Sequence, residues 1–378
     1  MTIDGHGRSR METNDGHGRS RKVVALGGEG IGPEVVDVTC ELLVKSGMPV
    51  EILTPPHGGP AIKSHGHPIP DETKRICESA DGVLFGAAGG PPTSAVVGWL
   101  RWEKGTFASV RPVKHYPGAS SPLAHPEGID YVIVRELSEG LYPGREGELA
   151  DLARAMPGLK DRFGRRVGDY GAGRFAAKIV TENGVERAAR FACELARRRK
   201  ARGTPGKLTC ITKSNVMPRA DGLFQQVVAE VAKREYPELA HEHFYVDDGA
   251  RRLVRFPRQM DVVLTMNLYG DILSDLGAET AGGLGMAPSG CYREGWAYFE
   301  SVHGSAPDIA GRGIANPTGA ILSAAMMLDH MKLASEAQRL ETAVARVFRD
   351  GKTLTADQGG KASTNDFASA VLEAYRSS

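Results

Sequence analysis

The sequence predicts an α/β protein built on a largely parallel, helix-covered β-sheet. Short apolar runs typical of buried strands alternate along the chain with segments of helical period. The chain has 378 residues, enough for two or three domains with ample core. Glycine accounts for 47 of them, well above the roughly 7% of ordinary proteins, whereas proline is not in surplus. This excess indicates many tight loops in which the backbone approaches another group closely.

The first third of the chain shows the alternation clearly. Residues 23–26 form a continuous apolar run, and Pro33 suits the first turn of a helix that extends toward residue 43. The next elements that we expect are a strand at residues 50–53, a helix at 71–79, and a strand at 82–85 that ends in the loop GAAGGPP.

The later elements repeat this pattern around one exception. We expect further strands at residues 131–134, 208–211 and 262–266, and helices at residues 186–199, 223–234, 314–328 and 336–348. Residues 143–176 are charged, glycine-rich and weakly periodic, so we interpret them as an inserted, protruding arm.

Composition excludes several classes of protein. A formal net charge of +1 offers no global field for nucleic acid or an anionic membrane. The five cysteines are scattered without a CxxC motif, which argues against disulfides and a thiolate zinc site and favours a cytoplasmic location. The uncharged segment 82–100 contains Pro91-Pro92 and glycines that would leave backbone groups unsatisfied in lipid, so we reject a membrane span.

The N-terminus carries the motif DGHGRSR twice, at residues 4–10 and 15–21. It lacks the apolar region of a secretory signal. We therefore expect residues 1–21 to be a disordered tail.

An acidic set follows the strand expected at residues 262–266. Asp271 and Asp275 are four residues apart, so on a helix they share one face and could hold a hard divalent cation. The alternative is a helix cap with a solvated second acid. Asp247 and Asp248, just upstream, favour the metal.

Three arginines lie in apolar contexts, namely Arg101, Arg111 and Arg135. The planar guanidinium binds carboxylates in bidentate fashion, so three converging arginines would suit a substrate with two or more carboxylates. Taken singly, an arginine in such a context more often forms a surface or interdomain ion pair. Lys213 and Tyr142 are candidates for proton transfer, although a lysine that follows a strand is often merely solvated.

Two glycine-rich loops are candidates for a nucleotide-binding site. The loop GGEGIG has GxGxG spacing followed by Pro33, which does not fit the dinucleotide fingerprint. Residues 303–317, HGSAPDIAGRGIANP, form a long loop of small residues that would allow a nucleotide close to the backbone. If Asp308 accepts a hydrogen bond from the ribose, NAD is favoured over NADP.

Together these motifs resemble the isocitrate/3-isopropylmalate dehydrogenase family, the metal-dependent β-decarboxylating dehydrogenases that include homoisocitrate and tartrate/D-malate enzymes. The resemblance spans residues 22–378 and rests on GEGIGPEV, GAAGGP, VRP, VREL, TKSN, YVD, GDILSD, GGLGMAPSG and HGSAPDIAGRGIANP. It implies a two-domain fold with a mixed, largely parallel sheet that is not a standard Rossmann domain. The implied division is a cofactor-binding domain of residues 22–106 plus 282–378, and a substrate and dimerisation domain of residues 107–281 with the arm near 143–176.

The resemblance also implies a role for each candidate residue. Substrate carboxylates would bind the three arginines, Tyr142 would be the proton donor, and Lys213 the base. The implied metal ligands are Asp271 and Asp275 with Asp247 from a partner subunit, which would also supply Lys213. The implied cofactor contacts are Asn215, Asn267, Glu300, His303, Gly304, Ser305, Ala306, Asp308 and Asn316.

The implied activity is oxidative decarboxylation of a 3-substituted (R)-malate of the 3-isopropylmalate, isocitrate or homoisocitrate type, with NAD and Mg²⁺ or Mn²⁺. The enzyme would be a homodimer, or a tetramer, that shares its active sites between subunits. Glu29 and Ser301 depart from the family's usual Asp and Pro. Val97 and Gly98, where the family reads the substituent on carbon 3, favour an apolar group. The alternatives are a tartrate/D-malate-type dehydrogenase and a non-catalytic regulatory or binding homologue.

Overall fold

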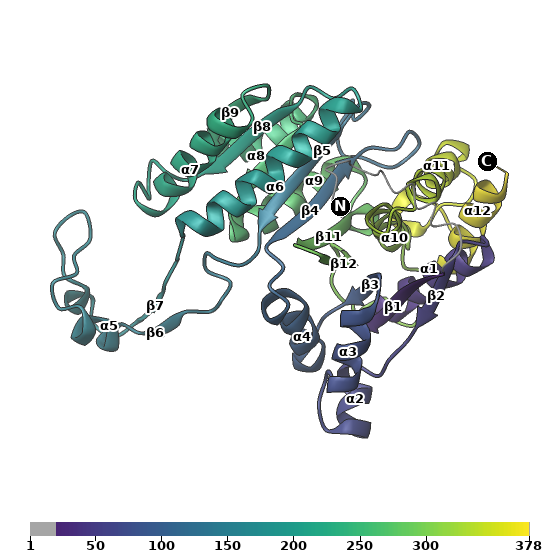
Figure 1. Ribbon diagram of the computed structural model, residues 1–378, viewed down its shortest axis with the longest axis horizontal. Helices are drawn as coiled ribbons and strands as arrows, with labels where there is room; N and C mark the ends of the chain where they lie inside the picture. The colour runs from purple at the N-terminus through teal and green to yellow at the C-terminus, as the bar shows by residue number, and fades with distance from the viewer. Residues whose placement is uncertain (1–19, 378) are drawn as a thin grey trace, which may run out of the picture.

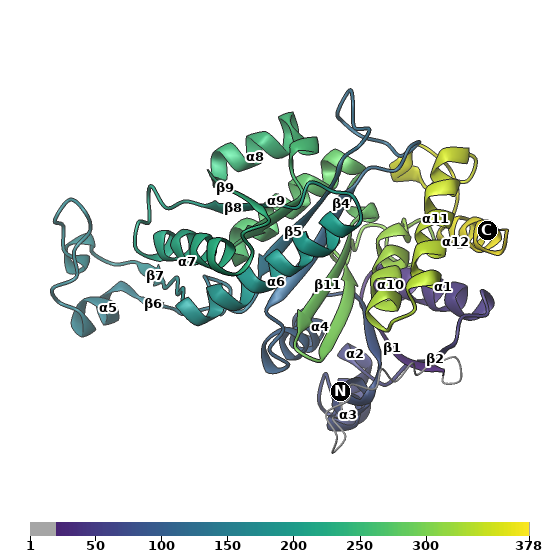
Figure 2. The same cartoon turned by 45° about the horizontal axis from the view of Figure 1, so that its top comes forward.

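A ten-stranded sheet forms the centre of the computed structural model, which describes residues 20–377 (Figures 1 and 2). Its strands lie in the order β2 (Val50–Leu53), β1 (Arg21–Gly28), β3 (Gly82–Ala87), β12 (Trp296–Ser301), β11 (Pro288–Arg293), β4 (Ala108–Lys114), β5 (Asp130–Glu136), β10 (Val262–Thr265), β8 (Lys207–Thr212) and β9 (Ala240–Tyr245). The pairings are parallel except where β12, β11, β4 and β5 meet. The prediction of a mixed, largely parallel α/β sheet is therefore confirmed.

Helices cover both faces of the sheet (Figure 1). The half that contains both ends of the described chain carries α1 (Gly32–Lys45), α2 (Gly58–His65), α3 (Asp71–Ser79), α4 (Pro91–Gly98), α10 (Thr318–His330), α11 (Ala334–Asp350) and α12 (Thr364–Arg376). The other half carries α6 (Glu182–Ala201), α7 (Ala220–Glu235), α8 (Val246–Arg255) and α9 (Asn267–Ala281). Helix α4 continues into a π-helical turn, Trp99–Glu103, and short 3₁₀ turns occur at Val167–Tyr170, Pro257–Gln259, Leu284–Met286 and Ala356–Gln358.

Separate apolar cores support the two halves. Under α1, α10, α11 and α12 the core includes Leu43, Leu328, Leu340, Phe348 and Phe367. Under α6 and α7 it includes Ala188, Ala192, Phe224, Val228 and Leu264. The sheet joins these cores, so residues carried by its central strands lie between the two halves.

Several sequence-based boundaries need correction. The expected helix at residues 314–328 begins only at Thr318, because Pro317 disfavours helical backbone in the residue before it. Helix α9 begins four residues before Asp271, so Asp271 does not open it. Residues 1–19 of the expected N-terminal tail lie outside the described residues, and Arg21 already belongs to β1.

The arm-like segment 143–176 extends away from the sheet (Figures 1 and 2). It contains β6 (Glu146–Glu148), α5 (Leu149–Ala155) and β7 (Arg174–Ala176), and β6 and β7 form their own antiparallel pair. Across residues 20–377, no helix is both long and apolar enough to cross a membrane.

Candidate active site

A cavity of about 360 Å³ lies between the two halves and is lined by the ends of β3 and β12 and by Arg111 of β4. Its wall gathers several side chains that the sequence singled out. The residues that line it are Phe85, Gly86, Ala87, Ala88, Ser94, Val97, Arg101, Trp102, Arg111, Tyr142, Glu300, Ser301, Val302, His303 and Gly304. Residues more than 200 positions apart in the sequence therefore meet in one polar cavity.

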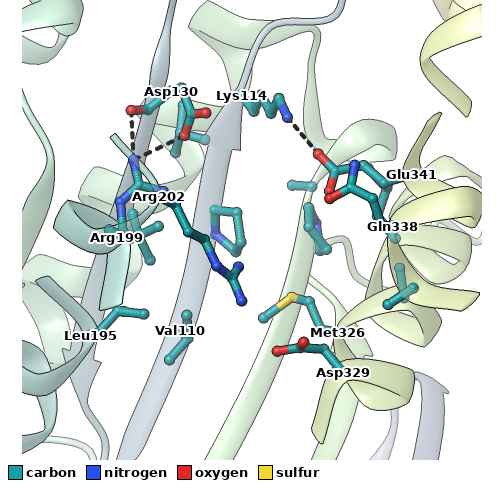
Figure 3. Close-up of a pocket in the computed structure, with 18 of the residues that line it drawn as sticks. Val110, Lys114, Asp130, Leu195, Arg199, Arg202, Met326, Asp329, Gln338 and Glu341 are labelled. Atoms are coloured by element: carbon teal, nitrogen blue, oxygen red, sulfur yellow. Dashed lines mark hydrogen bonds and ion pairs between the residues drawn. The ribbon is translucent and has the colours of Figure 1, made fainter. Parts of the chain in front are cut away.

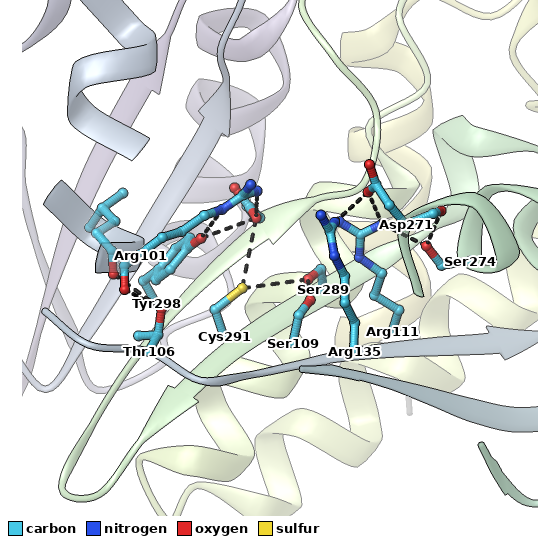
Figure 4. Close-up of polar contacts among 12 residues, drawn as sticks. Arg101, Thr106, Ser109, Arg111, Arg135, Asp271, Ser274, Ser289, Cys291 and Tyr298 are labelled. Carbon is cyan, nitrogen blue, oxygen red and sulfur yellow. Dashed lines mark hydrogen bonds and ion pairs between the residues drawn. The ribbon is translucent and has the colours of Figure 1, made fainter. Parts of the chain in front are cut away.

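Asp271 is the carboxylate on which this site converges (Figure 4). It accepts hydrogen bonds from Arg111 Nη1 at 3.2 Å, from Arg135 Nη1, and from the Tyr142 hydroxyl. Burial opposes the charge on Asp271, but Arg135, Tyr142 and Arg111 outweigh it and lower the pKa of this carboxyl group. Asp271 is therefore held as a carboxylate.

The arginines are positioned by neutral side chains of α9. Asn267 Oδ1 accepts from Arg135 Nε at 3.0 Å and from Nη2 at 2.8 Å. Ser274 Oγ accepts from Arg111 Nη1 at 2.6 Å, while Arg111 Nε is buried without a partner in the described part of the chain. Both arginines are almost fully buried, so they keep donors in a fixed orientation between the two halves.

Arg101 belongs to a second network, which the sequence did not indicate. Its Nε donates to the Tyr298 hydroxyl at 3.0 Å, and its Nη2 donates to Glu300 Oε1 at 2.8 Å (Figure 4). Cys291 Sγ lies 3.8 Å from the same Glu300 oxygen. Tyr298 and Cys291 lie on the neighbouring strands β12 and β11, and the contact of Tyr298 with an arginine 197 residues away leaves no local signal in the sequence.

The pKa values of Tyr142 and Asp275 are raised, whereas that of Asp271 is lowered. Burial, together with the hydrogen bond to Asp271, raises the pKa of Tyr142, whereas Arg135 lowers it less. Asp275 lies one helical turn after Asp271 on α9, with Oδ1 3.7 Å from Arg111 Nη1, and burial raises its pKa. Two carboxylates and a protonated hydroxyl thus surround the arginine pair.

Lys213 and Asp247 form an ion pair at the ends of β8 and β9. The buried Asp221 accepts a hydrogen bond from the Lys213 backbone at 2.7 Å and pairs with Lys178, which fixes this loop. Within residues 20–377, no hydrogen bond or ion pair joins Lys213 or Asp247 to the Asp271 cluster, and no group of three His, Cys, Asp or Glu side chains is arranged to hold a metal. Asp248 instead pairs with arginines of α8.

The glycine loops approach one another as well as the cavity. Gly30 has φ +63°, and a Cβ there would lie 2.0 Å from the Ser305 carbonyl oxygen, which accepts a hydrogen bond from Ile31. Glu29 Oε1 accepts a hydrogen bond from the Gly90 backbone. Hydrogen bonds therefore hold the loops after β1, β3 and β12 together, and a side chain at Gly30 would break the contact with the loop after β12.

The remaining expected cofactor residues occupy different environments. His303 Nδ1 lies 3.0 Å from the Gly304 carbonyl oxygen, and its Nε2 is buried without a partner among the described residues. Ala306 adopts φ +40°. Asn316 is buried and binds Asp357 and Thr318. Asp308 and Asn215 are exposed, whereas Asn267 is engaged with Arg135.

Comparison with known proteins gives consistent matches over nearly the whole chain. The family model described as isocitrate/isopropylmalate dehydrogenase matches residues 22–371. A 3-isopropylmalate dehydrogenase of Archaeoglobus fulgidus is 41% identical over 351 residues, which cover 93% of this chain and 98% of that protein. An isocitrate/homoisocitrate dehydrogenase of Thermus thermophilus is 40% identical and covers 94% of this chain and 99% of its own.

Two further proteins extend the comparison. A 3-isopropylmalate/3-methylmalate dehydrogenase of Methanocaldococcus jannaschii is 41% identical, with 94% of this chain and 99% of that protein covered. Among solved structures, an isocitrate dehydrogenase from Methylococcus capsulatus matches with a TM-score of 0.80 and 34% identity, and covers 94% of this chain and 99% of its own.

Proposed function

Because the chain belongs to the isocitrate/isopropylmalate dehydrogenase family, we propose that it catalyses the NAD-dependent and divalent-metal-dependent oxidative decarboxylation of a 3-substituted (R)-malate. The family and the relatives identify a dehydrogenase of the isopropylmalate/isocitrate type. The observation that carries the finer proposal is the cavity of about 360 Å³ in which Arg101, Arg111 and Tyr142 meet beside Asp271.

The charges of this cavity suit a dicarboxylate. Arg111 and Arg135 share one carboxylate, and the buried Nε of Arg111 lacks a hydrogen-bond partner in residues 20–377. A buried donor of this kind gains most from a ligand oxygen. Arg101, on the far wall, would bind a second carboxylate of the same substrate.

The acidic side chains fit a hard cation. Asp271 and Asp275 offer carboxylate oxygens from one face of α9, a donor set that Mg²⁺ or Mn²⁺ accepts together with substrate oxygens. Asp247 of a second subunit would complete the set, since the single chain leaves Asp247 beside Lys213.

The loop after β12 fits NAD. His303 and Gly304 line the cavity, and Ser305 and Ala306 follow them directly in the chain. The buried, unpartnered Nε2 of His303 offers a polar contact. We assign Asp308 to the ribose and Asn215, Glu300 and Asn316 to the surroundings of the cofactor.

When bound, NAD supplies a hydride acceptor and the divalent ion polarises the oxygen on carbon 2. Lys213 of the partner would remove the proton of the C2 hydroxyl group. The arginines orient the substrate so that the carboxylate on carbon 3 leaves as CO₂. Tyr142, whose raised pKa keeps it protonated, would then donate a proton to carbon 3.

The wall formed by α4 favours an alkyl substituent on carbon 3. Val97, Ser94 and the half-exposed Trp102 line this part of the cavity, and none of them carries a charge. The one cation of this segment that lines the cavity, Arg101, already pairs with Glu300 and is assigned to the second substrate carboxylate, so a third carboxylate would be desolvated there without a free cationic partner, whereas an isopropyl or methyl group would bury apolar surface. Gly98, the other expected reading position, is not among the lining residues.

The proposed organisation assigns residues 22–106 plus 282–378 to the cofactor and residues 107–281 to the substrate and the dimer. The two apolar cores support such a division. Because Lys213 and Asp247 lie away from the Asp271 cluster in the single chain, we expect each active site to use residues of two subunits.

The test is NADH formation, with Mn²⁺ or Mg²⁺, on a panel of 3-isopropylmalate, 3-methylmalate, isocitrate, homoisocitrate, tartrate and D-malate. We expect the alkylmalates to give the highest kcat/KM and EDTA to abolish turnover. Asp271→Asn is the matched inactive control. A higher kcat/KM for tartrate or D-malate than for the alkylmalates would favour the alternative of a tartrate/D-malate-type dehydrogenase. Absence of both turnover and NAD binding would favour the non-catalytic homologue.

A further inference from the structure

A second and larger cavity, of about 860 Å³, lies over β4, between α6 on one side and α10 and α11 on the other (Figure 3). The cavities share one strand: Arg111 of β4 lines the candidate active site, whereas Val110 and Pro112 line the second cavity. Successive side chains of a strand point to opposite faces, so β4 separates the two spaces. The second cavity is therefore not an extension of the active site.

The walls of this cavity come from both halves of the molecule. Leu195 and Arg202 belong to the α6 side, and Met326 and Gln338 belong to α10 and α11. Figure 3 shows Arg202 reaching from the α6 side into the cavity. The ion pair of Lys114 on β4 with Glu341 on α11, at 2.5 Å, joins the strand to the α11 wall.

Charge in the cavity is unbalanced. Arg199 pairs with Asp130 and Lys114 pairs with Glu341, which neutralises both cations. Arg198, Arg202 and Lys332 also line the cavity, and within residues 20–377 none of their side chains makes an ion pair or a hydrogen bond. Asp329 is the one acidic lining residue that remains unpaired in the described chain. Three cationic groups thus face one carboxylate.

The lining is partly apolar, with Val110 and Pro112 on the β4 floor, Leu195 on the α6 wall and Met326 on the α10 wall. The volume lies in the range of small-molecule sites, about 300–1,000 Å³. Apolar surface below and unpaired cations at the rim together suit a ligand with an apolar body and an anionic head.

We propose that this cavity binds an amphipathic organic anion, such as a carboxylate or phosphate ester with an apolar portion, at a site separate from the substrate and the cofactor. The apolar portion contacts the β4 floor. The anionic head lies near Arg198 and Arg202.

The probe for the test is 8-anilinonaphthalene-1-sulfonate, an organic anion whose fluorescence rises on leaving water. In fluorescence titrations of the full chain we expect saturable binding, unaffected by saturating NADH. The double variant Arg198→Gln/Arg202→Gln should weaken binding at least fivefold. Arg197→Gln is the matched control, because Arg197 lies on the same helix but pairs with Glu194 and does not line the cavity.

A second variant tests the cavity itself. Gln338→Trp adds bulk to an exposed lining residue and should abolish the signal, whereas Gln226→Trp, on exposed surface of α7, should leave it unchanged. Displacement of the probe by NADH would assign the signal to the cofactor site and overturn the proposal. Unchanged affinity in both the double variant and Gln338→Trp, or no saturable binding, would overturn it equally.

Discussion

Asn267 offers the sharpest test of how the site is held together. Its side chain is 1% exposed, and it accepts two hydrogen bonds from Arg135 and donates two to the carbonyl groups of Leu137 and Glu139. In Asn267→Ala the buried guanidinium and the buried Leu137 carbonyl lose these partners. An unsatisfied buried polar group costs about 1–3 kcal/mol, and more when it is charged. The free energy of unfolding should therefore fall by about 3–6 kcal/mol.

Urea unfolding at one fixed protein concentration measures this loss. Asn215→Ala is the control, because Asn215 is exposed and should change stability by less than about 0.5 kcal/mol. If Asn215 contacts the cofactor, its variant should instead weaken NAD binding. A loss below about 1 kcal/mol in Asn267→Ala, combined with weakened NAD binding, would refute the positioning role and assign Asn267 to the nicotinamide.

Three other outcomes are expected. If Tyr142 is the proton donor, as proposed above, kcat of Tyr142→Phe should fall about 10²- to 10⁴-fold while KM changes little, because only the hydroxyl group is lost; steady-state rates within threefold of wild type would contradict this role. Burial lowers the pKa of His57, against a smaller opposite effect of a backbone hydrogen bond. Below about pH 6.5, His57 therefore binds a proton more readily in the unfolded chain than in the folded chain, so the free energy of unfolding falls as the pH drops. The urea midpoint of His57→Gln should fall less than that of the wild type as the pH drops below about 6.5. In Gly30→Ala, the new Cβ would meet the Ser305 carbonyl oxygen at 2.0 Å, at φ +63°, so the melting temperature should drop. Gly304→Ala, which meets open space, should melt like the wild type.

The sequence predicts those elements whose signal is local. Strands β2, β3 and β10 are short apolar runs, and helix α3 matches its expected bounds because Pro70 precedes it and its pattern is amphipathic. Strand β4 was missed because it carries Arg111, Pro112 and Lys114. It lies in the centre of the sheet because it pairs with β5, the next strand along the chain, and with β11, which is distant in the sequence.

In the candidate site, too, the sequence predicts features with a local signal and misses those that depend on distant strands. The residue types and the spacing of Asp271 and Asp275 are visible in the sequence, because four residues form one helical turn. The pairing of Arg101 with Glu300 depends on the position of β12 beside β3, which no local pattern encodes. The family resemblance identifies the position of Asn267 and implies a cofactor contact there. It does not identify the hydrogen bonds of the Asn267 side chain, which in the structure join it to Arg135.

The three arginines explain why this chain should gain stability from an anionic ligand. Burial and repulsion by Arg111 and Arg101 lower the pKa of Arg135 to about 10, and Asp271 offsets them only in part. Arg135 is still protonated at neutral pH, so the folded chain retains this repulsion as an unfavourable electrostatic energy. A dicarboxylate bound between the arginines would offset it, because each carboxylate attracts the arginines nearest to it. A neutral analogue of equal shape lacks this attraction, so it should bind more weakly than the dicarboxylate and stabilise the folded chain less.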